Sequence, residues 1–211
     1  MPQAGQVGQV DIVCAIIAGG NATRLQGREK ALLPVGGVAI IDRQLAVLAP
    51  LFSRILVVTP RPEPFVDRPV TVIPDRTPGA GPLGGIDAAL AALEGAEQGA
   101  FCVAADLPFL SAEVIQALLN AAHTEFQNGT AQAVAFRRNG FPEPLSACYS
   151  RFALPTVMAR LAAQAHKATA LLESLPTHWL DENTLRTLDP NDRHFQNINT
   201  EAAWRDADAT G

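Results

Sequence analysis

A short apolar run at residues 11–17 is followed, one residue later, by two adjacent glycines, Gly19 and Gly20. A run that is apolar on both faces predicts a buried strand of a parallel sheet. Because glycine has no side chain, the backbone beyond the strand can approach a ligand closely, and its free N–H groups can bind anionic oxygens. Arg24 and Lys30 follow on the same loop. We therefore expect a polyphosphate to bind at the carboxyl end of this strand.

Strand-like and helix-like patterns alternate along the rest of the chain. The strands are expected at 11–17, 54–59, 70–73, 100–105, 131–137 and 145–149, and the helices at 39–49, 85–94, 111–122, 153–164 and 201–207. This alternation predicts an α/β fold, a three-layer α/β/α sandwich around a Rossmann-like, mostly parallel sheet. The turn Arg138-Asn139-Gly140 predicts a hairpin, so the sheet should be mixed.

The domain organisation follows from the absence of repeats and linkers in this pattern. We expect a flexible tail at 1–10 and a single domain over 11–211, in which 165–194 is a loose segment. In the helix expected at 111–122, Ser111 is the predicted N-cap, and Thr200 is the predicted N-cap of the last helix.

Composition excludes several classes of protein. The net charge of −5 argues against a nucleic-acid partner, which needs a basic face. No apolar stretch approaches the roughly 18 residues of a membrane span, and the N-terminus lacks the features of a signal peptide. The three cysteines, Cys14, Cys102 and Cys148, lie in apolar runs and are expected to be buried thiols, and the four histidines are expected on the surface. A cytoplasmic location fits these features best.

A second glycine-rich loop follows a later strand. Gly79, Gly81 and Gly84 match G-x-G-x-x-G, and Asp106 follows about 22 residues after the last of them, which imitates a dinucleotide-binding fingerprint. Pro82 removes an amide donor from this turn, and another glycine loop already occupies the first strand-to-helix turn. A nicotinamide-dependent oxidoreductase therefore stays as an alternative to the polyphosphate site.

Two further side chains are candidate metal ligands. Asp106 comes directly after the strand expected at 100–105 and before Leu107-Pro108, so a rigid backbone holds its carboxylate in place. Such a carboxylate could bind Mg²⁺ together with substrate phosphates. Its alternative role is a helix cap. Asn199 can offer a carbonyl oxygen to a metal, and its alternative role is to shape a turn.

Five segments, in this order along the chain, carry a resemblance to the molybdenum cofactor guanylyltransferase family of the nucleotidyltransferase superfamily. They are Ala18-Gly-Gly20 with Arg24 and Lys30, Pro78–Gly84, Ala105–Pro108, Glu143–Leu145 and Asn197–Thr200. They resemble the family's A-G-G…R…K, G-P-L-x-G, C-D-x-P, E-P-L and N-x-N-T elements. The resemblance runs from about residue 12 to 205.

The resemblance implies a role for each matching residue. Ile17, Ala18, Gly19, Gly20, Thr59 and Asp75 would contact the guanine nucleotide, Lys30 would bind its phosphates, and Asp106 would hold Mg²⁺, with Asn199 as a second metal ligand. The implied reaction transfers GMP from GTP to the molybdopterin cofactor, and molybdoenzymes or cofactor-insertion proteins are implied partners. The chemistry of the residues agrees, because Arg24 and Lys30 could stabilise the pyrophosphate that leaves.

Two alternatives to this activity remain from the sequence. One is a cytidylyltransferase or another nucleotidyltransferase that acts on a cofactor or on a sugar or polyol phosphate. The other is a non-catalytic protein that binds the nucleotide or cofactor and delivers it. The pair Gly19-Gly20 favours GTP over CTP by resemblance, and the presence of Arg24, Lys30 and Asp106 favours an enzyme over a delivery protein.

Overall fold

The central sheet has seven strands in the part of the chain that the computed structural model describes, residues 11–19, 24–25 and 28–211. The strands lie in the order β11-β9-β10-β8-β1-β6-β7. Their bounds are β1 Asp11–Ile17, β6 Ile55–Val58, β7 Thr71–Ile73, β8 Glu97–Ala104, β9 Ala133–Arg138, β10 Phe141–Ser150 and β11 Thr177–Leu180. β10 pairs antiparallel with both β8 and β9, and the other pairs are parallel. The predicted mixed sheet is confirmed.

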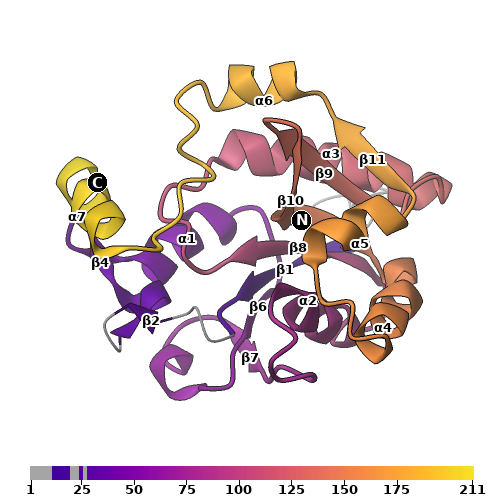
Figure 1. Cartoon of the computed structure of the whole chain (residues 1–211), viewed down its shortest axis with the longest axis horizontal. Helices are drawn as coiled ribbons and strands as arrows, with labels where there is room; N and C mark the ends of the chain where they lie inside the picture. Colours follow the sequence, from indigo (N-terminus) through magenta and orange to yellow (C-terminus); the bar gives the residue numbers. More distant parts are fainter. Residues whose placement is uncertain (1–10, 20–23, 26–27) are drawn as a thin grey trace, which may run out of the picture.

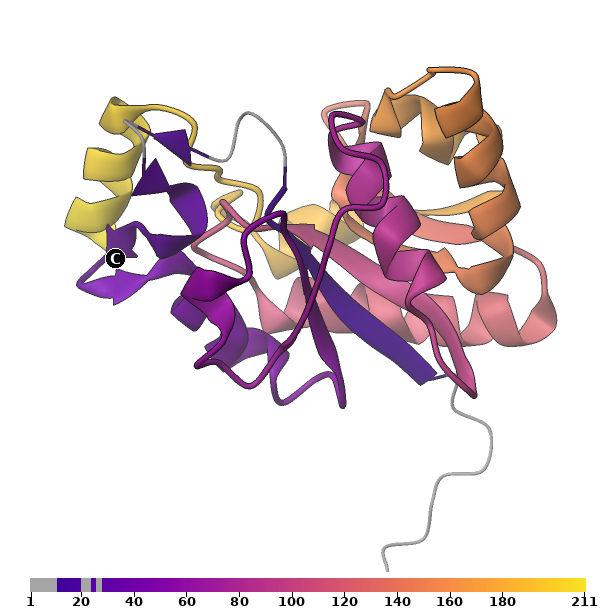
Figure 2. The same ribbon diagram turned by 90° about the horizontal axis from the view of Figure 1, so that it is seen from below.

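Helices cover both faces of this sheet, as Figures 1 and 2 show. On one face, α2 (Pro82–Ala91), α4 (Leu154–Ala162) and α5 (Ala168–Ser174) contribute to one apolar core. On the other, α1 (Ile40–Leu48), α3 (Ala112–Asn128) and α6 (Glu182–Leu188) contribute to a second core. The predicted three-layer α/β/α sandwich is therefore confirmed.

Small elements complete the fold. Around the carboxyl edge of the sheet lie the ribbons β2 (Arg24–Leu25) with β3 (Arg28–Glu29) and β4 (Pro34–Val35) with β5 (Val38–Ala39), the short helix η2 (Lys30–Leu32) and the last helix α7 (Glu201–Thr210). The short helix η3 (Glu63–Phe65) lies between β6 and β7 in the chain, and η4 (Arg151–Ala153) follows β10 at the opposite edge. α7 lies beside β4 in Figure 1. Trp204 Nε1 donates to the carbonyl oxygen of Pro34 at 2.6 Å, so the C-terminal helix braces the segment that follows Lys30.

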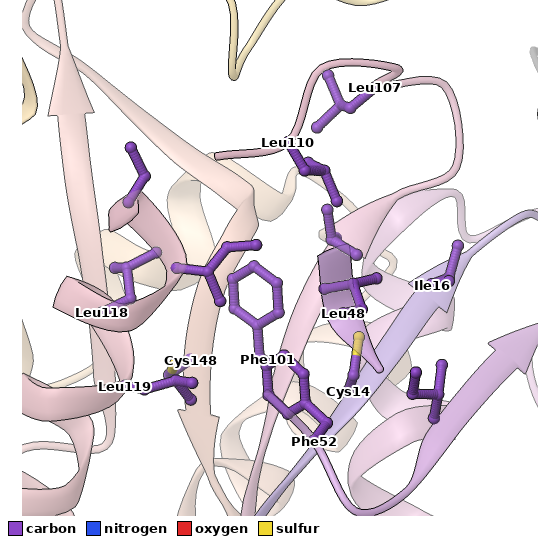
Figure 3. Packing of buried hydrophobic residues seen from close by; sticks show 14 of the residues in the cluster. Cys14, Ile16, Leu48, Phe52, Phe101, Leu107, Leu110, Leu118, Leu119 and Cys148 are labelled. Carbon is purple, nitrogen blue, oxygen red and sulfur yellow. The ribbon is translucent and has the colours of Figure 1, made fainter. Parts of the chain in front are cut away.

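Aromatic and sulfur-containing side chains help to fill the two cores. Phe52 and Phe101 stack with ring centroids 5.6 Å apart, between the leucines of α3 and those of α1 (Figure 3). Cys14, Cys102 and Cys148 are buried and free, as predicted, and burial raises the pKa of each thiol. These cysteines therefore act as small apolar side chains in the core.

The predicted caps are both confirmed. Ser111 Oγ accepts from the backbone N–H of Val114 at 3.2 Å, and Thr200 Oγ1 accepts from that of Ala203 at 3.1 Å. At the predicted hairpin turn, Asn139 and Gly140 have φ angles of 51° and 80°, which is the conformation of a tight turn between antiparallel strands.

Two expectations from the sequence are wrong. Residues 165–194 are not loose, because they form α5, β11 and α6. Each of these is only four to seven residues long, and elements so short depend on packing rather than on their own propensity. His194 is not on the surface but fully buried. The predicted tail at 1–10 lies outside the described residues. None of the described helices is long and apolar enough to cross a membrane.

Candidate active site

A cavity of about 380 Å³ lies at the carboxyl ends of β1 and β8. Ligands bind at this edge in open α/β sheets. The segments that line it come from six parts of the chain. Its lining comprises Ile17–Gly19, Glu29–Ala31, Gly81, Pro82, Ala104–Leu107, Arg138, Glu143–Leu145, Phe195 and Asn197.

The end of β1 forms the floor of the cavity with its backbone. Ala18 N–H donates to the carbonyl oxygen of Val58 at 2.9 Å, and the carbonyl oxygen of Ile17 accepts from the N–H of Ala105 at 3.2 Å. These bonds tie β1 to its two neighbours up to the last residue before Gly19. The predicted nucleotide contacts Ile17, Ala18 and Gly19 therefore line the cavity, and Gly20 lies outside the described residues.

Lys30 brings three of the predicted site residues together. Its ammonium group lies 2.5 Å from Asn199 Oδ1 and 3.4 Å from Asp106 Oδ2, although these partners are 169 and 76 residues away in the chain. The Lys30 side chain is only 6% exposed. A cation desolvated in this way acts more strongly on a nearby phosphate than one in water. The backbone of Arg24 pairs with that of Glu29 in the β2–β3 ribbon, and the Arg24 side chain lies outside the described residues.

Hydrogen bonds to the backbone fix the turn that carries Asp106. The carbonyl oxygen of Asp106 accepts from the N–H of Ile198 at 3.0 Å. Gln44 Nε2 donates to the carbonyl oxygens of Ala104 and Leu107, at 2.8 and 3.0 Å. Asp106 is not a helix cap, because Ser111 caps the helix that follows. That alternative is therefore wrong, and the carboxylate is left facing the cavity.

The oxygens available at the cavity suit a hard divalent cation. Among the described residues, no three His, Cys, Asp or Glu side chains form a group that could hold a metal on their own. Asp106 supplies a carboxylate that is 20% exposed, and Asn199 supplies an amide oxygen at the same ammonium group. One or two protein oxygens completed by substrate phosphates and water is the usual Mg²⁺ site, so the residues present fit such an ion.

Two other predicted nucleotide contacts lie beside the cavity rather than in its lining. Asp75 Oδ1 accepts from the N–H of Thr77 at 2.8 Å, and its Oδ2 would lie 3.8 Å from a side chain built at Gly19. Asp75 is therefore next to the first glycine loop. Thr59 is buried, and its hydroxyl accepts from the N–H of Arg61 at 3.2 Å. The Thr59 side chain stabilises its own turn, and its contact with a nucleotide stays a prediction.

The second glycine loop delivers the start of α2 to the cavity. Pro82 is the first residue of this helix, where its missing N–H costs nothing. Gly85 packs so closely on β1 that a Cβ there would lie 2.4 Å from Ile17 Cγ2. The positive end of the helix dipole therefore points toward the cavity, where it favours an anion.

Sequence reasoning gave no role to the opposite wall, formed by the β9–β10 hairpin and residues 192–197. Arg138 Nε donates to Glu143 Oε1 at 2.7 Å, and Nη1 donates to Asp192 Oδ2 at 2.8 Å. The Arg138 guanidinium carbon lies 5.4 Å from the centre of the Phe195 ring. Burial raises the pKa of Glu143, and the hydrogen bond from Arg138 opposes this. The Glu-Pro-Leu segment at 143–145 was the sequence signal that could have pointed to this wall.

The buried side chain of His194 stabilises this wall. Its Nδ1 accepts from the N–H of Ser111 at 3.0 Å, so the ring proton is on Nε2, which lies 2.8 Å from Ser146 Oγ. Burial lowers the pKa of His194 to about 4. The imidazole packs edge-on against the Phe195 ring, with centroids 4.6 Å apart. A neutral histidine thus links β10, the start of α3 and the cavity-lining Phe195.

Comparison with known proteins agrees with this arrangement. Residues 14–179 match the MobA-like NTP transferase domain family. A molybdenum cofactor guanylyltransferase from Syntrophotalea carbinolica is 30% identical over 186 residues, which cover 88% of this chain and 86% of the relative. A protein from Pelotomaculum thermopropionicum, named probable molybdenum cofactor guanylyltransferase, is 32% identical with the same coverage.

A solved structure extends the agreement to three dimensions. The molybdopterin-guanine dinucleotide biosynthesis protein A from Archaeoglobus fulgidus aligns with a TM-score of 0.77 and 25% identity, over 94% of this chain and 98% of its own. The family match over residues 14–179 includes the last four residues of β1, the glycine loops and the turn at Asp106. This chain therefore belongs to the MobA-like NTP transferase family and is a nucleotidyltransferase.

Proposed function

We propose that this enzyme transfers GMP from GTP to the phosphate of the molybdopterin cofactor, forming molybdopterin guanine dinucleotide and pyrophosphate in a Mg²⁺-dependent reaction. The observation that carries the proposal is that Lys30, which lines the cavity together with Asp106, contacts both Asp106 and Asn199. Relatives of about 30% identity over most of the chain bear the name of this activity, which supports the choice of substrates.

The reaction needs no protein nucleophile. A phosphate oxygen of the acceptor attacks the α-phosphorus of GTP, a new P–O bond forms, and the bond from the α-phosphorus to the bridging oxygen breaks. Pyrophosphate takes the electron pair of that bond. The enzyme contributes positioning and charge stabilisation, which dominate catalysis of phosphoryl and nucleotidyl transfer.

The residues of the cavity divide these tasks. The backbone at Ala18 and Gly19 holds the nucleotide, and the positive end of α2 lies over its phosphates. Lys30 and Arg24 stabilise the charge that develops on the leaving pyrophosphate. Asp106 and Asn199 would hold Mg²⁺, which when bound supplies Lewis-acid stabilisation of phosphate charge. The ammonium group of Lys30 contacts one side-chain oxygen of each of these two residues.

The free thiols and the proposed substrates support a cytoplasmic setting. Three buried cysteines without disulfides fit a reducing compartment, so we place the reaction in the cytoplasm. The dinucleotide product would pass to molybdoenzymes or to proteins that insert the cofactor. The alternatives of a dinucleotide-dependent oxidoreductase and of a non-catalytic delivery protein receive no support from the family.

The test is a transfer assay with purified enzyme, Mg²⁺ and molybdopterin loaded with molybdate. GTP, CTP, ATP and UTP are supplied in turn, and both pyrophosphate release and the dinucleotide are measured. We expect stoichiometric pyrophosphate and guanine dinucleotide with GTP. A product formed only with CTP, or no product with any of the four nucleotides, would refute the proposal.

A further inference from the structure

Glu143 is a carboxylate in the cavity that the proposed transfer chemistry does not use. It lies on β10, at the opposite wall from the first glycine loop, with Arg138 beside it. The chemical step is accounted for by residues at the ends of β1 and β8 and by Lys30. A group that faces the same cavity without a part in the chemistry is a candidate for recognising a substrate.

An irregularity in β10 turns Glu143 toward the cavity. β10 pairs with β9 at Phe141 and Pro142 and resumes only at Ala147, while its pairing with β8 begins at Ser146. Residues 143–145 thus leave both ladders, and all three line the cavity. Tyr149 Oη donates to the carbonyl oxygen of Pro144 at 2.9 Å and holds the irregular segment. Such irregularities occur next to active sites, where they redirect side chains.

One oxygen of the Glu143 carboxylate accepts a hydrogen bond from the described residues, and the other does not. Oε1 accepts from Arg138 Nε at 2.7 Å, and no described residue donates a hydrogen bond to Oε2. The side chain is only 24% exposed. A partly buried carboxylate oxygen without a protein donor can accept a hydrogen bond from a ligand in the cavity. Arg138, fixed by Asp192 on its other side, orients the carboxylate.

The surroundings of Glu143 suit a flat heteroaromatic ring. Phe195, Pro144, Leu145 and Leu107 line the same cavity with apolar groups. A pterin ring is planar and presents two adjacent donors, the 2-amino group and N3–H, along one edge. A carboxylate oxygen accepts such donors well, while the apolar side chains cover the ring faces.

We propose that Glu143 recognises the 2-amino-4-oxo edge of the acceptor's pterin and so determines which acceptor enters the site. The inference rests on the proposed function, because that function makes a pterin the acceptor. Guanine has the same hydrogen-bonding edge, but the sheet order separates the two sites. β8 lies between β10 and β1, which puts Glu143 roughly 10 Å from the β1 loop at normal strand spacing, and Asp75 lies beyond β1 near Gly19.

A pair of ligands tests the proposal on the unaltered enzyme. Pterin carries the 2-amino group, whereas lumazine has a second carbonyl there. Their binding to the enzyme saturated with GTP and Mg²⁺ is followed by ligand fluorescence, and unlabelled molybdopterin is added as competitor. We expect pterin to bind roughly 10-fold to 100-fold more tightly than lumazine, as for a charge-assisted hydrogen bond. Equal binding of the two ligands, or failure of molybdopterin to displace pterin from the GTP-saturated enzyme, would overturn the proposal.

The matched variants are Glu143→Gln and, as control, Glu173→Gln at an exposed position of α5. Glu143→Gln should lose most of the preference for pterin and raise the KM for molybdopterin roughly 10-fold, with the melting shift by GTP unchanged. If Glu143 served only to pair with Arg138, the variant would weaken both ligands equally, which overturns the proposal. The transfer assay tests the proposed function independently of the pterin preference. Absence of transfer with the pterin preference intact refutes the proposed function alone, and transfer without that preference refutes this inference alone.

Discussion

The two walls of the cavity are built in different ways. The wall at the ends of β1 and β8 is held by backbone hydrogen bonds, such as those of Ala18, Ala105 and Asp106. The wall at β10 is held by side chains: the Arg138 ion pairs, the contact of Arg138 with Phe195, and buried His194. The residues of the first wall belong to short motifs that can be recognised in the sequence, whereas the second wall depends on pairs of side chains that share no motif, such as Arg138 and Asp192.

This difference predicts that the two walls have different functions. Backbone atoms present the same donors whatever side chains surround them, which suits phosphates that every nucleotide carries. Side chains give a surface that can be adapted to one ligand. Substitutions at the first wall should therefore impair the chemical step, and those at the second wall should alter acceptor binding or stability.

The largest effect is expected for Asp106→Asn at the first wall. The substitution keeps the size of the side chain but removes the charge that would hold Mg²⁺. We expect transfer activity to fall roughly 10³-fold or more and the Mg²⁺ midpoint to rise, with melting temperature nearly unchanged. An active variant with the wild-type Mg²⁺ midpoint would contradict the metal-binding role.

Lys30→Ala should have the next largest effect. Removing the ammonium group leaves the developing charge on pyrophosphate without a partner, so kcat should fall on the order of 10²-fold. The only other lysine of the chain, Lys167, is exposed, and Lys167→Ala serves as control. Turnover of Lys30→Ala close to that of the control would remove Lys30 from the chemical step.

At the second wall, His194 should make stability depend on pH. Its pKa is lowered by burial from 6.5 to about 4, so the unfolded chain binds the proton first as pH falls. The free energy of unfolding should therefore decrease between pH 6.5 and about pH 4, by up to about 3 kcal/mol, and level off below. Urea unfolding of the wild type and His194→Gln across this range checks it. Equal pH slopes for both proteins would show that His194 contributes nothing to the decrease.

Gly85→Ala tests how tightly α2 must pack on the first wall. The added methyl group would lie 2.4 Å from Ile17 Cγ2, so we expect a loss of about 1–3 kcal/mol in the free energy of unfolding. In an Ile17→Ala background the same substitution should cost much less, which a double-mutant cycle measures. Additive effects would mean that the two residues do not meet.

The smallest expected effect concerns the choice of nucleotide. If Gly19-Gly20 favours guanine, GTP should raise the melting temperature more than CTP at equal concentration, since a ligand of the native state stabilises it by mass action. A 10-fold difference in affinity corresponds to about 1.4 kcal/mol. Equal shifts with GTP and CTP would leave the nucleotidyltransferase assignment intact and remove its preference for GTP.

Sequence reasoning was most successful where a residue's role is local. Ser111 and Thr200 act as the predicted caps within three residues of their own position. It failed for His194, whose surroundings come from Ser111, Ser146 and Phe195. A histidine in a polar segment carries no signal of burial by itself. Likewise, 165–194 lacks long periodic patterns, and its short elements form because the sheet and α3 supply surfaces to pack on.

The sequence by itself determined the alternation of strands and helices, the loop of Gly19 and Lys30, and the carboxylate of Asp106 at a strand end. These follow from local periodicity and from the chemistry of neighbouring residues. Only the tertiary structure decided that Lys30, Asp106 and Asn199 meet, and that Glu143 leaves its ladder to line the same cavity as Lys30 and Asp106. The physical reason is that such contacts depend on the order and register of strands distant in the chain, which no short motif encodes.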